Sequence, residues 1–113
     1  MSKLSLVKPK GIILALGENE YNLVYDFNAF AELEREFGDI QTAFEKMSAS
    51  PKLSDILKIV QAGLISNETR ISERELGSYL TPKNMPQVVE LINEAMVEAM
   101  PQETQTDTKS TKN

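Results

Sequence analysis

One stretch, residues 25–38, constrains the fold of this chain more than any other. Its sequence is Tyr-Asp-Phe-Asn-Ala-Phe-Ala-Glu-Leu-Glu-Arg-Glu-Phe-Gly. Phe30, Leu33 and Phe37 recur at helical spacing, with Phe27 beside them. Because aromatic side chains of soluble proteins are usually buried, we expect a helix that anchors these residues in the core. Three of the four Phe residues of the chain lie on this one predicted element.

Both ends of this helix are marked in the sequence, and a hairpin precedes it. Asp26 and Asn28 are both candidates for the N-cap, because either side chain can accept a bond from the first free N–H groups. Gly38 follows the last apolar position, where a left-handed residue ends many helices. Within residues 11–25, two alternating apolar runs flank a turn at 17–20, which predicts a β-hairpin. An isolated hairpin is barely stable, so its apolar face must lie on the helices or on another chain.

The rest of the chain predicts four more helices. Asp39 is a good N-cap for the first of them. Ser72-Glu-Arg-Glu75 is a capping box, in which a Ser hydroxyl and a Glu carboxylate satisfy free N–H groups at the start of a helix. The predicted helices span about 40–47, 53–64, 73–80 and 84–100. The predicted fold is therefore mainly α (α+β), with an N-terminal β-hairpin packed on a bundle of about five short helices.

The composition along the chain predicts one domain with two loose ends. Residues 11–101 are expected to form a single globular domain, with the hairpin at 11–25 and the helices at 26–100. Residues 1–10 are expected to be flexible, because Pro9 and three lysines interrupt their short apolar pieces. Residues 102–113 contain no apolar side chain. Such a segment cannot offset the entropy lost on ordering, so we expect a disordered polar tail.

The residue types that most enzymes rely on are missing. The chain has no Cys and no His, which removes thiolate chemistry, the commonest general base and the commonest transition-metal ligands. Glu32, Glu34 and Glu36 alternate along the first helix, which spreads the carboxylates around it. No Gly-rich loop for phosphate and no nucleophile elbow occurs. We therefore predict a protein that is not an enzyme and that binds no cofactor and no metal.

The charge argues against nucleic acid and membrane partners. The chain carries 12 basic and 17 acidic side chains, a net charge of −5, and no apolar run approaches the roughly 20 residues that span a bilayer. A helix-turn-helix regulator is the alternative function, because residues 73–80 and 85–92 have the outline of that motif. Glu90, Glu94 and Glu98 oppose it, since they would face phosphates from the recognition helix.

Protein binding is the function that remains. The last predicted helix is apolar around more of its circumference than a small core needs, and Met side chains adapt to varied apolar partners. The alternative is that these residues complete the core or a contact between copies of the chain in a homo-oligomer. The predicted partner-binding residues are Met85, Val89, Met96, Val97 and Met100.

Three segments in this order resemble a known family. They are Tyr21 to Glu34, Ile59-Val-Gln-Ala-Gly-Leu64 and Ile71-Ser-Glu-Arg-Glu-Leu76. Together they are similar to the tail assembly chaperones of long-tailed bacteriophages and prophages of Gram-positive hosts, over roughly residues 11–100. The resemblance implies a small protein without enzymatic activity that binds the helical, apolar tape measure protein and keeps it soluble. It also implies that tail tube subunits are recruited around that client, in the cytoplasm of the infected bacterium, and that the chaperone is absent from the mature virion.

Overall fold

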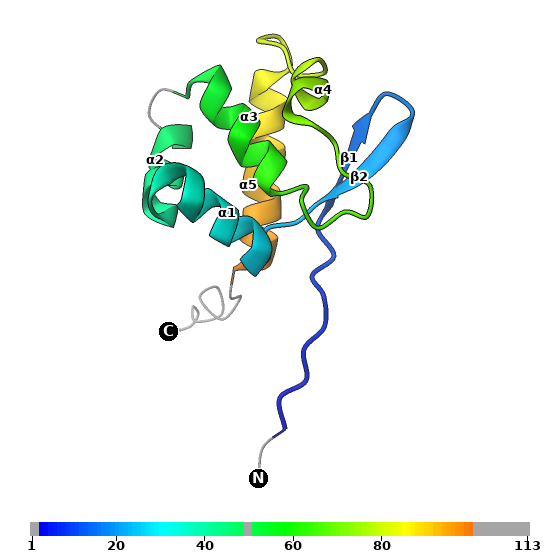
Figure 1. Ribbon diagram of the computed structural model, residues 1–113, viewed down its shortest axis with the longest axis vertical. Helices are drawn as coiled ribbons and strands as arrows, with labels where there is room; N and C mark the ends of the chain where they lie inside the picture. Colours follow the sequence, from blue (N-terminus) through cyan, green and yellow to red (C-terminus); the bar gives the residue numbers. More distant parts are fainter. Residues whose placement is uncertain (1–2, 49–50, 101–113) are drawn as a thin grey trace, which may run out of the picture.

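The computed structural model describes residues 3–48 and 51–100, which form a two-stranded hairpin followed by five helices (Figure 1). This confirms the predicted α+β fold. The predicted polar tail, 102–113, lies outside the described residues. The elements are β1 (Ile12–Leu16), β2 (Asn19–Leu23), α1 (Phe27–Phe37), α2 (Ile40–Ser48), α3 (Leu53–Ala62), α4 (Glu73–Gly77) and α5 (Met85–Ala99).

The hairpin is antiparallel, with Ile12 opposite Leu23 and Leu16 opposite Asn19. Two residues connect the strands, and the first of them, Gly17, has a φ of +64°. Only glycine adopts such a backbone conformation at little cost, and tight hairpin turns depend on it. One face of the hairpin packs on the core, where Leu16 and Leu23 are almost fully buried.

A side chain from a distant loop covers the outer edge of β2. The Asn22 N–H donates to the Asn67 side-chain oxygen, and the Asn67 amide donates to the Asn22 carbonyl, both at 2.8 Å. One residue beyond the strand, the Val24 N–H donates to the Gly63 carbonyl, also at 2.8 Å. The outward groups of Asn22 and the N–H of Val24 are thus already paired, so a neighbouring strand could not use them.

Helix α1 begins and ends where its sequence predicts, but one of its aromatic residues is not buried as predicted. Asp26 is the N-cap, because its carboxylate accepts from the Ala29 N–H at 3.0 Å. Gly38 ends the helix at a φ of +94°. Phe27 is 90% exposed, so the prediction that it anchors the core is wrong. At 100° per residue, its side chain projects about 120° around the helix from the buried Leu33.

Helix α3 is the centre of the core, as predicted, and it packs against α1, α2 and α4. Ile56, Ile59 and Val60 on this helix are each no more than 1% exposed. The hydroxyl of the buried Tyr25 donates to the Ile59 carbonyl at 2.8 Å, and burial raises the pKa of Tyr25 far above its usual range. This bond fixes the end of the hairpin against α3.

Local signals in the sequence determine where the two C-terminal helices, α4 and α5, begin. The Ser72 hydroxyl accepts from the Glu75 N–H at 3.0 Å, which confirms the predicted cap of α4. Asn84 is the N-cap of α5, but its side chain bonds backward instead, accepting from the Thr81 N–H at 2.9 Å. This turn sends α5 along the body behind α3, beside β1 (Figure 1).

Candidate protein-binding surfaces

The five residues predicted to bind a partner do not share one surface patch. Met96 is 5% exposed and belongs to the core, which corrects its expected place on the surface. It follows Ile92 by four residues, so both side chains lie on the same face of α5. Met85 and Val89 are half-buried and pack against the core, whereas Val97 and Met100 are exposed near the other end of the helix.

The most exposed large apolar side chains lie elsewhere, on an N-terminal arm and at the start of α1. We define the arm as residues 3–10, which have no regular secondary structure and extend away from the helices (Figure 1). Leu6 is 81% exposed, and Val7 and Phe27 are each 90% exposed. Sequence periodicity gave no sign of this grouping, because the arm and α1 are brought together only by the fold.

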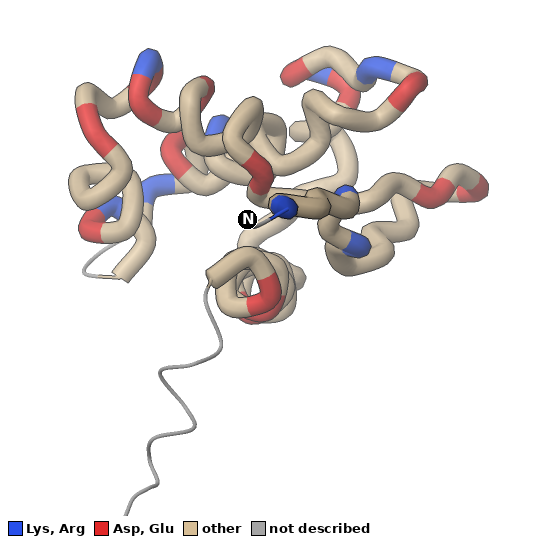
Figure 2. Tube along the Cα trace, turned by 90° about the horizontal axis from the view of Figure 1, so that it is seen from below, with Lys and Arg blue, Asp and Glu red and all other residues tan. Residues whose placement is uncertain are grey.

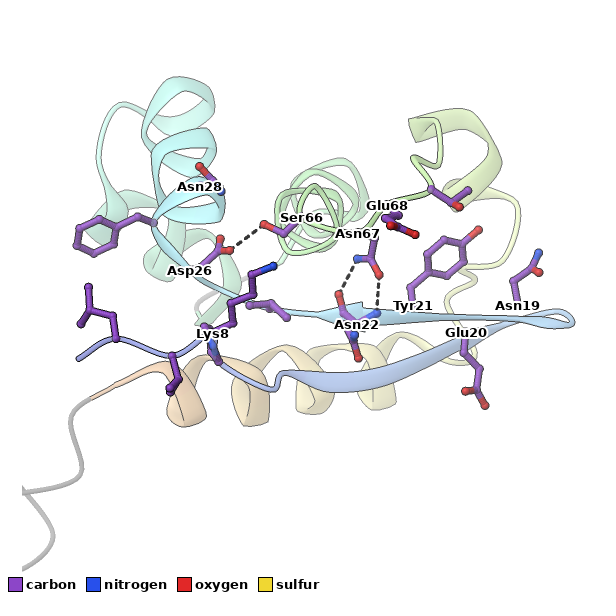
Figure 3. Close-up of a pocket in the computed structure, with 16 residues that line it drawn as sticks. Lys8, Asn19, Glu20, Tyr21, Asn22, Asp26, Asn28, Ser66, Asn67 and Glu68 are labelled. Carbon is purple, nitrogen blue, oxygen red and sulfur yellow. Dashed lines mark hydrogen bonds between the residues drawn. The ribbon is translucent and has the colours of Figure 1, made fainter.

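These three side chains line one groove, which we call the arm groove (Figure 3). It has a volume of about 1040 Å³ and lies between the arm, β2, the start of α1 and the loop at residues 66–69. Lys8 extends from the arm toward Asp26 and Ser66 on the opposite wall (Figure 3). The groove is therefore apolar at one end and polar along its loop wall.

Hydrogen bonds hold the polar wall of the arm groove in place. Asp26 accepts from the Ser66 hydroxyl at 2.8 Å while it caps α1, and Asn67 binds both the strand at Asn22 and the Leu64 carbonyl. The loop is thus tied to a helix and to a strand at once. A wall fixed in this way costs little additional ordering when a ligand binds.

Another, smaller hollow is lined mainly by apolar side chains. It has a volume of about 220 Å³ and lies where the start of α3, the end of α4 and the start of α5 meet. Leu53, which is 56% exposed, stands beside it. This apolar pocket is lined by Leu53, Ser54, Ile56, Leu57, Gly77, Leu80, Thr81, Met85 and Val88. Of the predicted partner-binding residues, it includes Met85.

The charged side chains do not form a surface that favours nucleic acid. Every charged residue on α5 is acidic, and the three glutamates Glu90, Glu94 and Glu98 are exposed (Figure 2). Lys58 lies between two carboxylates, 3.5 Å from Glu36 and 3.6 Å from Glu73, and both raise its pKa. This lysine joins α3 to α1 and α4 and is engaged within the fold.

Neither a metal-binding cluster nor a membrane-spanning helix occurs in residues 3–48 and 51–100. Over these ranges, no group of three or more acidic side chains lies close enough to hold a metal ion. No helix in this part of the chain is long and apolar enough to cross a membrane. The arm groove and the apolar pocket each include exposed large apolar side chains.

Comparison with known proteins gives one match. A family model described as "Phage tail tube protein, GTA-gp10" matches residues 11–101, which include the hairpin and all five described helices. No curated protein and no solved structure matches the chain.

Proposed function

This chain belongs to that family of phage tail proteins, and from this premise we propose that it is a tail assembly chaperone that binds the tape measure protein and keeps it soluble. In this role it makes and breaks no covalent bond. It acts in the cytoplasm of the infected bacterium, helps to recruit tail tube subunits around the client, and is absent from the mature virion.

The observation that carries the proposal is the exposure of Leu6, Val7 and Phe27 along one groove. Clustered exposed apolar side chains usually mark interaction sites. A tape measure protein is long, helical and apolar along one face, so its stripe would lie in the arm groove, as helices lie in grooves of other binding proteins. The polar wall would meet the solvated flank of the same helix.

The size of this surface suits a client that must later be released. Burying one Leu, Val or Phe side chain gives about 1.5–3 kcal/mol, so three of them give roughly 4.5–9 kcal/mol. Association itself costs several kcal/mol in lost freedom of motion. Affinity from one copy is therefore modest and reversible, and several copies along a client would add to it.

Co-expression with a tape measure fragment tests the proposal. We expect the fragment to be soluble in the presence of this chain and to co-purify with it, and to precipitate when it is produced alone. Equal precipitation with and without this chain would contradict a chaperone function.

A second experiment separates a chaperone from a tube subunit, the role named in the family description. Purified phage particles would be analysed by mass spectrometry for peptides of this chain. We expect none above background, whereas the tail tube subunit itself should be abundant. Stoichiometric amounts of this chain in the particles would instead make it a structural component of the tail.

A further inference from the structure

The arm is a strongly basic segment in a chain whose net charge is −5. It contains Lys3, Lys8 and Lys10, and the first acidic side chain of the sequence is Glu18. All three lysines are exposed. In the part of the chain that the structure describes, none of them forms an ion pair. The arm therefore carries three positive charges that the fold itself does not use.

These charges lie beside the apolar end of the arm groove. Leu6 and Val7, which line the groove, are placed between Lys3 and Lys8 in the sequence. Lys8 also lines the groove and extends toward its opposite wall (Figure 3). A partner that covers the two apolar side chains is therefore brought within reach of the lysines. Carboxylates on that partner would complement the arm, whereas amines would be repelled by it.

The start of the hairpin holds the base of the arm against the groove. A Cβ at Gly11 would lie 2.8 Å from the Leu23 carbonyl oxygen and would collide with the Val24 side chain. The backbone thus runs directly against the end of β2 at this point. Because Val24 itself lines the groove, the arm begins at the groove wall.

The loop wall of the arm groove carries the opposite sign of charge. Asp26 and Glu68 lie on it, and Asp26 already accepts two hydrogen bonds. Glu20 also borders the groove, but its side chain points to the other side of the strand from Tyr21 (Figure 3). A helix that lies in the groove therefore meets lysines along one flank and a carboxylate along the other.

We propose that the client helix is acidic on the flank that faces the arm, with Glu or Asp beside its apolar stripe. This inference rests on the proposed function and deepens it, because it names the chemistry of the client at the same site. A client helix that is basic on this flank would be repelled by the arm and would leave its three charges without partners.

The spacing of the lysines agrees with a helical client. The arm runs extended (Figure 1). Residues two apart in an extended segment, such as Lys8 and Lys10, lie on the same side and about 6.6 Å from each other. Residues four apart on a helix are about 6 Å from each other along its axis. Acidic residues at positions i and i+4 of the client would thus match both lysines.

Two synthetic helical peptides test the inference. They share one apolar stripe and one neutral flank, and the other flank carries Glu in the first peptide and Lys in the second. We expect the natural chain to bind the Glu peptide at least about tenfold more tightly at low salt, because exposed ion pairs replace repulsions. The preference should shrink as salt is added. The net charge of −5 alone would favour the Lys peptide instead.

The outcomes separate this inference from the chaperone function. Equal binding of the two peptides, or a preference for the Lys peptide, would overturn the inference and leave the chaperone function intact. Binding of neither peptide would overturn the inference and would also count against the arm groove as a site for helices.

Charge reversal on the arm locates the effect. A variant in which all three arm lysines are replaced by Glu should lose the preference for the Glu peptide and reverse it. The matched control makes the same change in net charge at exposed lysines outside the groove, with Lys46→Glu, Lys52→Glu and Lys83→Glu. We expect this control to keep the natural preference. An equal loss in both triple variants would show that net charge governs binding, and would overturn the inference.

Crosslinking with a carbodiimide identifies the contact, because this reagent joins an amine directly to a neighbouring carboxylate. With the Glu peptide, we expect crosslinks at the arm lysines and none above background at Lys52. Another acidic helix is α5 of a second copy of this chain, which carries Glu90, Glu94 and Glu98. Crosslinks from the arm to those glutamates in place of the peptide would assign the arm to a second copy and overturn the inference.

Discussion

Asn67 and Asn22 form a two-point contact, in which one side-chain amide pairs with both the N–H and the C=O of a strand residue 45 positions earlier. The same amide also donates to the Leu64 carbonyl at 3.0 Å. This single residue holds the polar wall of the arm groove and closes the edge of β2.

Substitution of Asn67 should therefore loosen the loop and open the edge. We expect Asn67→Ala to lower the free energy of unfolding by roughly 1–2 kcal/mol, because three hydrogen bonds are lost at a partly buried site. Amide hydrogen exchange should accelerate at Asn22. Asn28→Ala, another asparagine of the arm groove, is the control and should leave exchange at Asn22 unchanged. Unaltered protection of the Asn22 amide in Asn67→Ala would contradict this account.

Because the hydroxyl of Tyr25 is buried, the free energy of unfolding should depend on pH in the alkaline range. Burial raises the pKa of Tyr25 above its usual value of 10.0, so the folded state holds this proton more tightly than the unfolded state. Stability from this source is complete below pH 10.0 and falls as the pH rises above it. Tyr25→Phe should lose about 1 kcal/mol at neutral pH with the bond to Ile59, and should lack that alkaline decline. Urea unfolding at pH 7 and above pH 10 measures both effects.

Two glycines should respond in opposite ways to the same change. A Cβ at Gly63 would lie 2.6 Å from the Leu23 side chain and 2.8 Å from the Tyr25 ring, whereas one at Gly77 would meet Leu57 at an ordinary 3.6 Å. We expect Gly63→Ala to destabilise the protein by about 1–3 kcal/mol through overpacking. Gly77→Ala should be neutral or stabilise it by up to about 1 kcal/mol. Thermal unfolding of both variants gives the comparison.

Asp39 should give the opposite pH dependence to Tyr25. The Thr42 side chain and its N–H, which donates to the carboxylate at 2.7 Å, lower the pKa of Asp39 below its usual value of 3.8. The stability that it contributes is present above pH 3.8 and is lost as the pH falls below the depressed value. The difference in unfolding free energy between the natural chain and Asp39→Ala should therefore shrink in acid. Glu45→Ala, on the helix α2 that follows Asp39, is the control.

Local signals in the sequence predicted the elements of this fold. The capping residues Asp26 and Ser72 and the terminal Gly38 act within three or four residues of themselves, so no other part of the chain is needed to read them. The central position of α3 followed in the same way from its continuous apolar stripe. These are the features for which local chemistry and tertiary packing agree.

The candidate site could not be predicted in this way. Helical spacing places Phe27 near the apolar stripe of α1. How much of that stripe is buried depends on the elements that pack against it, which helical spacing does not give. The same reasoning applies to Met96, which the core encloses. The contact between Asn67 and Asn22 joins residues with no local relationship. Features that depend on long-range packing, including the arm groove, required the structure.

The central claim is tested most directly with two variants, each of which changes one exposed apolar residue. The quantity measured is their affinity for a tape measure fragment. Phe27→Ser changes the arm groove, and Leu53→Ser changes an exposed apolar residue beside the apolar pocket, so the two variants are matched in chemistry. In a fluorescence titration, we expect Phe27→Ser to bind the fragment at least about tenfold more weakly than the natural chain, as loss of an apolar anchor does. Leu53→Ser should bind like the natural chain, and both variants should keep its unfolding temperature. Undiminished binding by Phe27→Ser would contradict the claim that the arm groove holds the client.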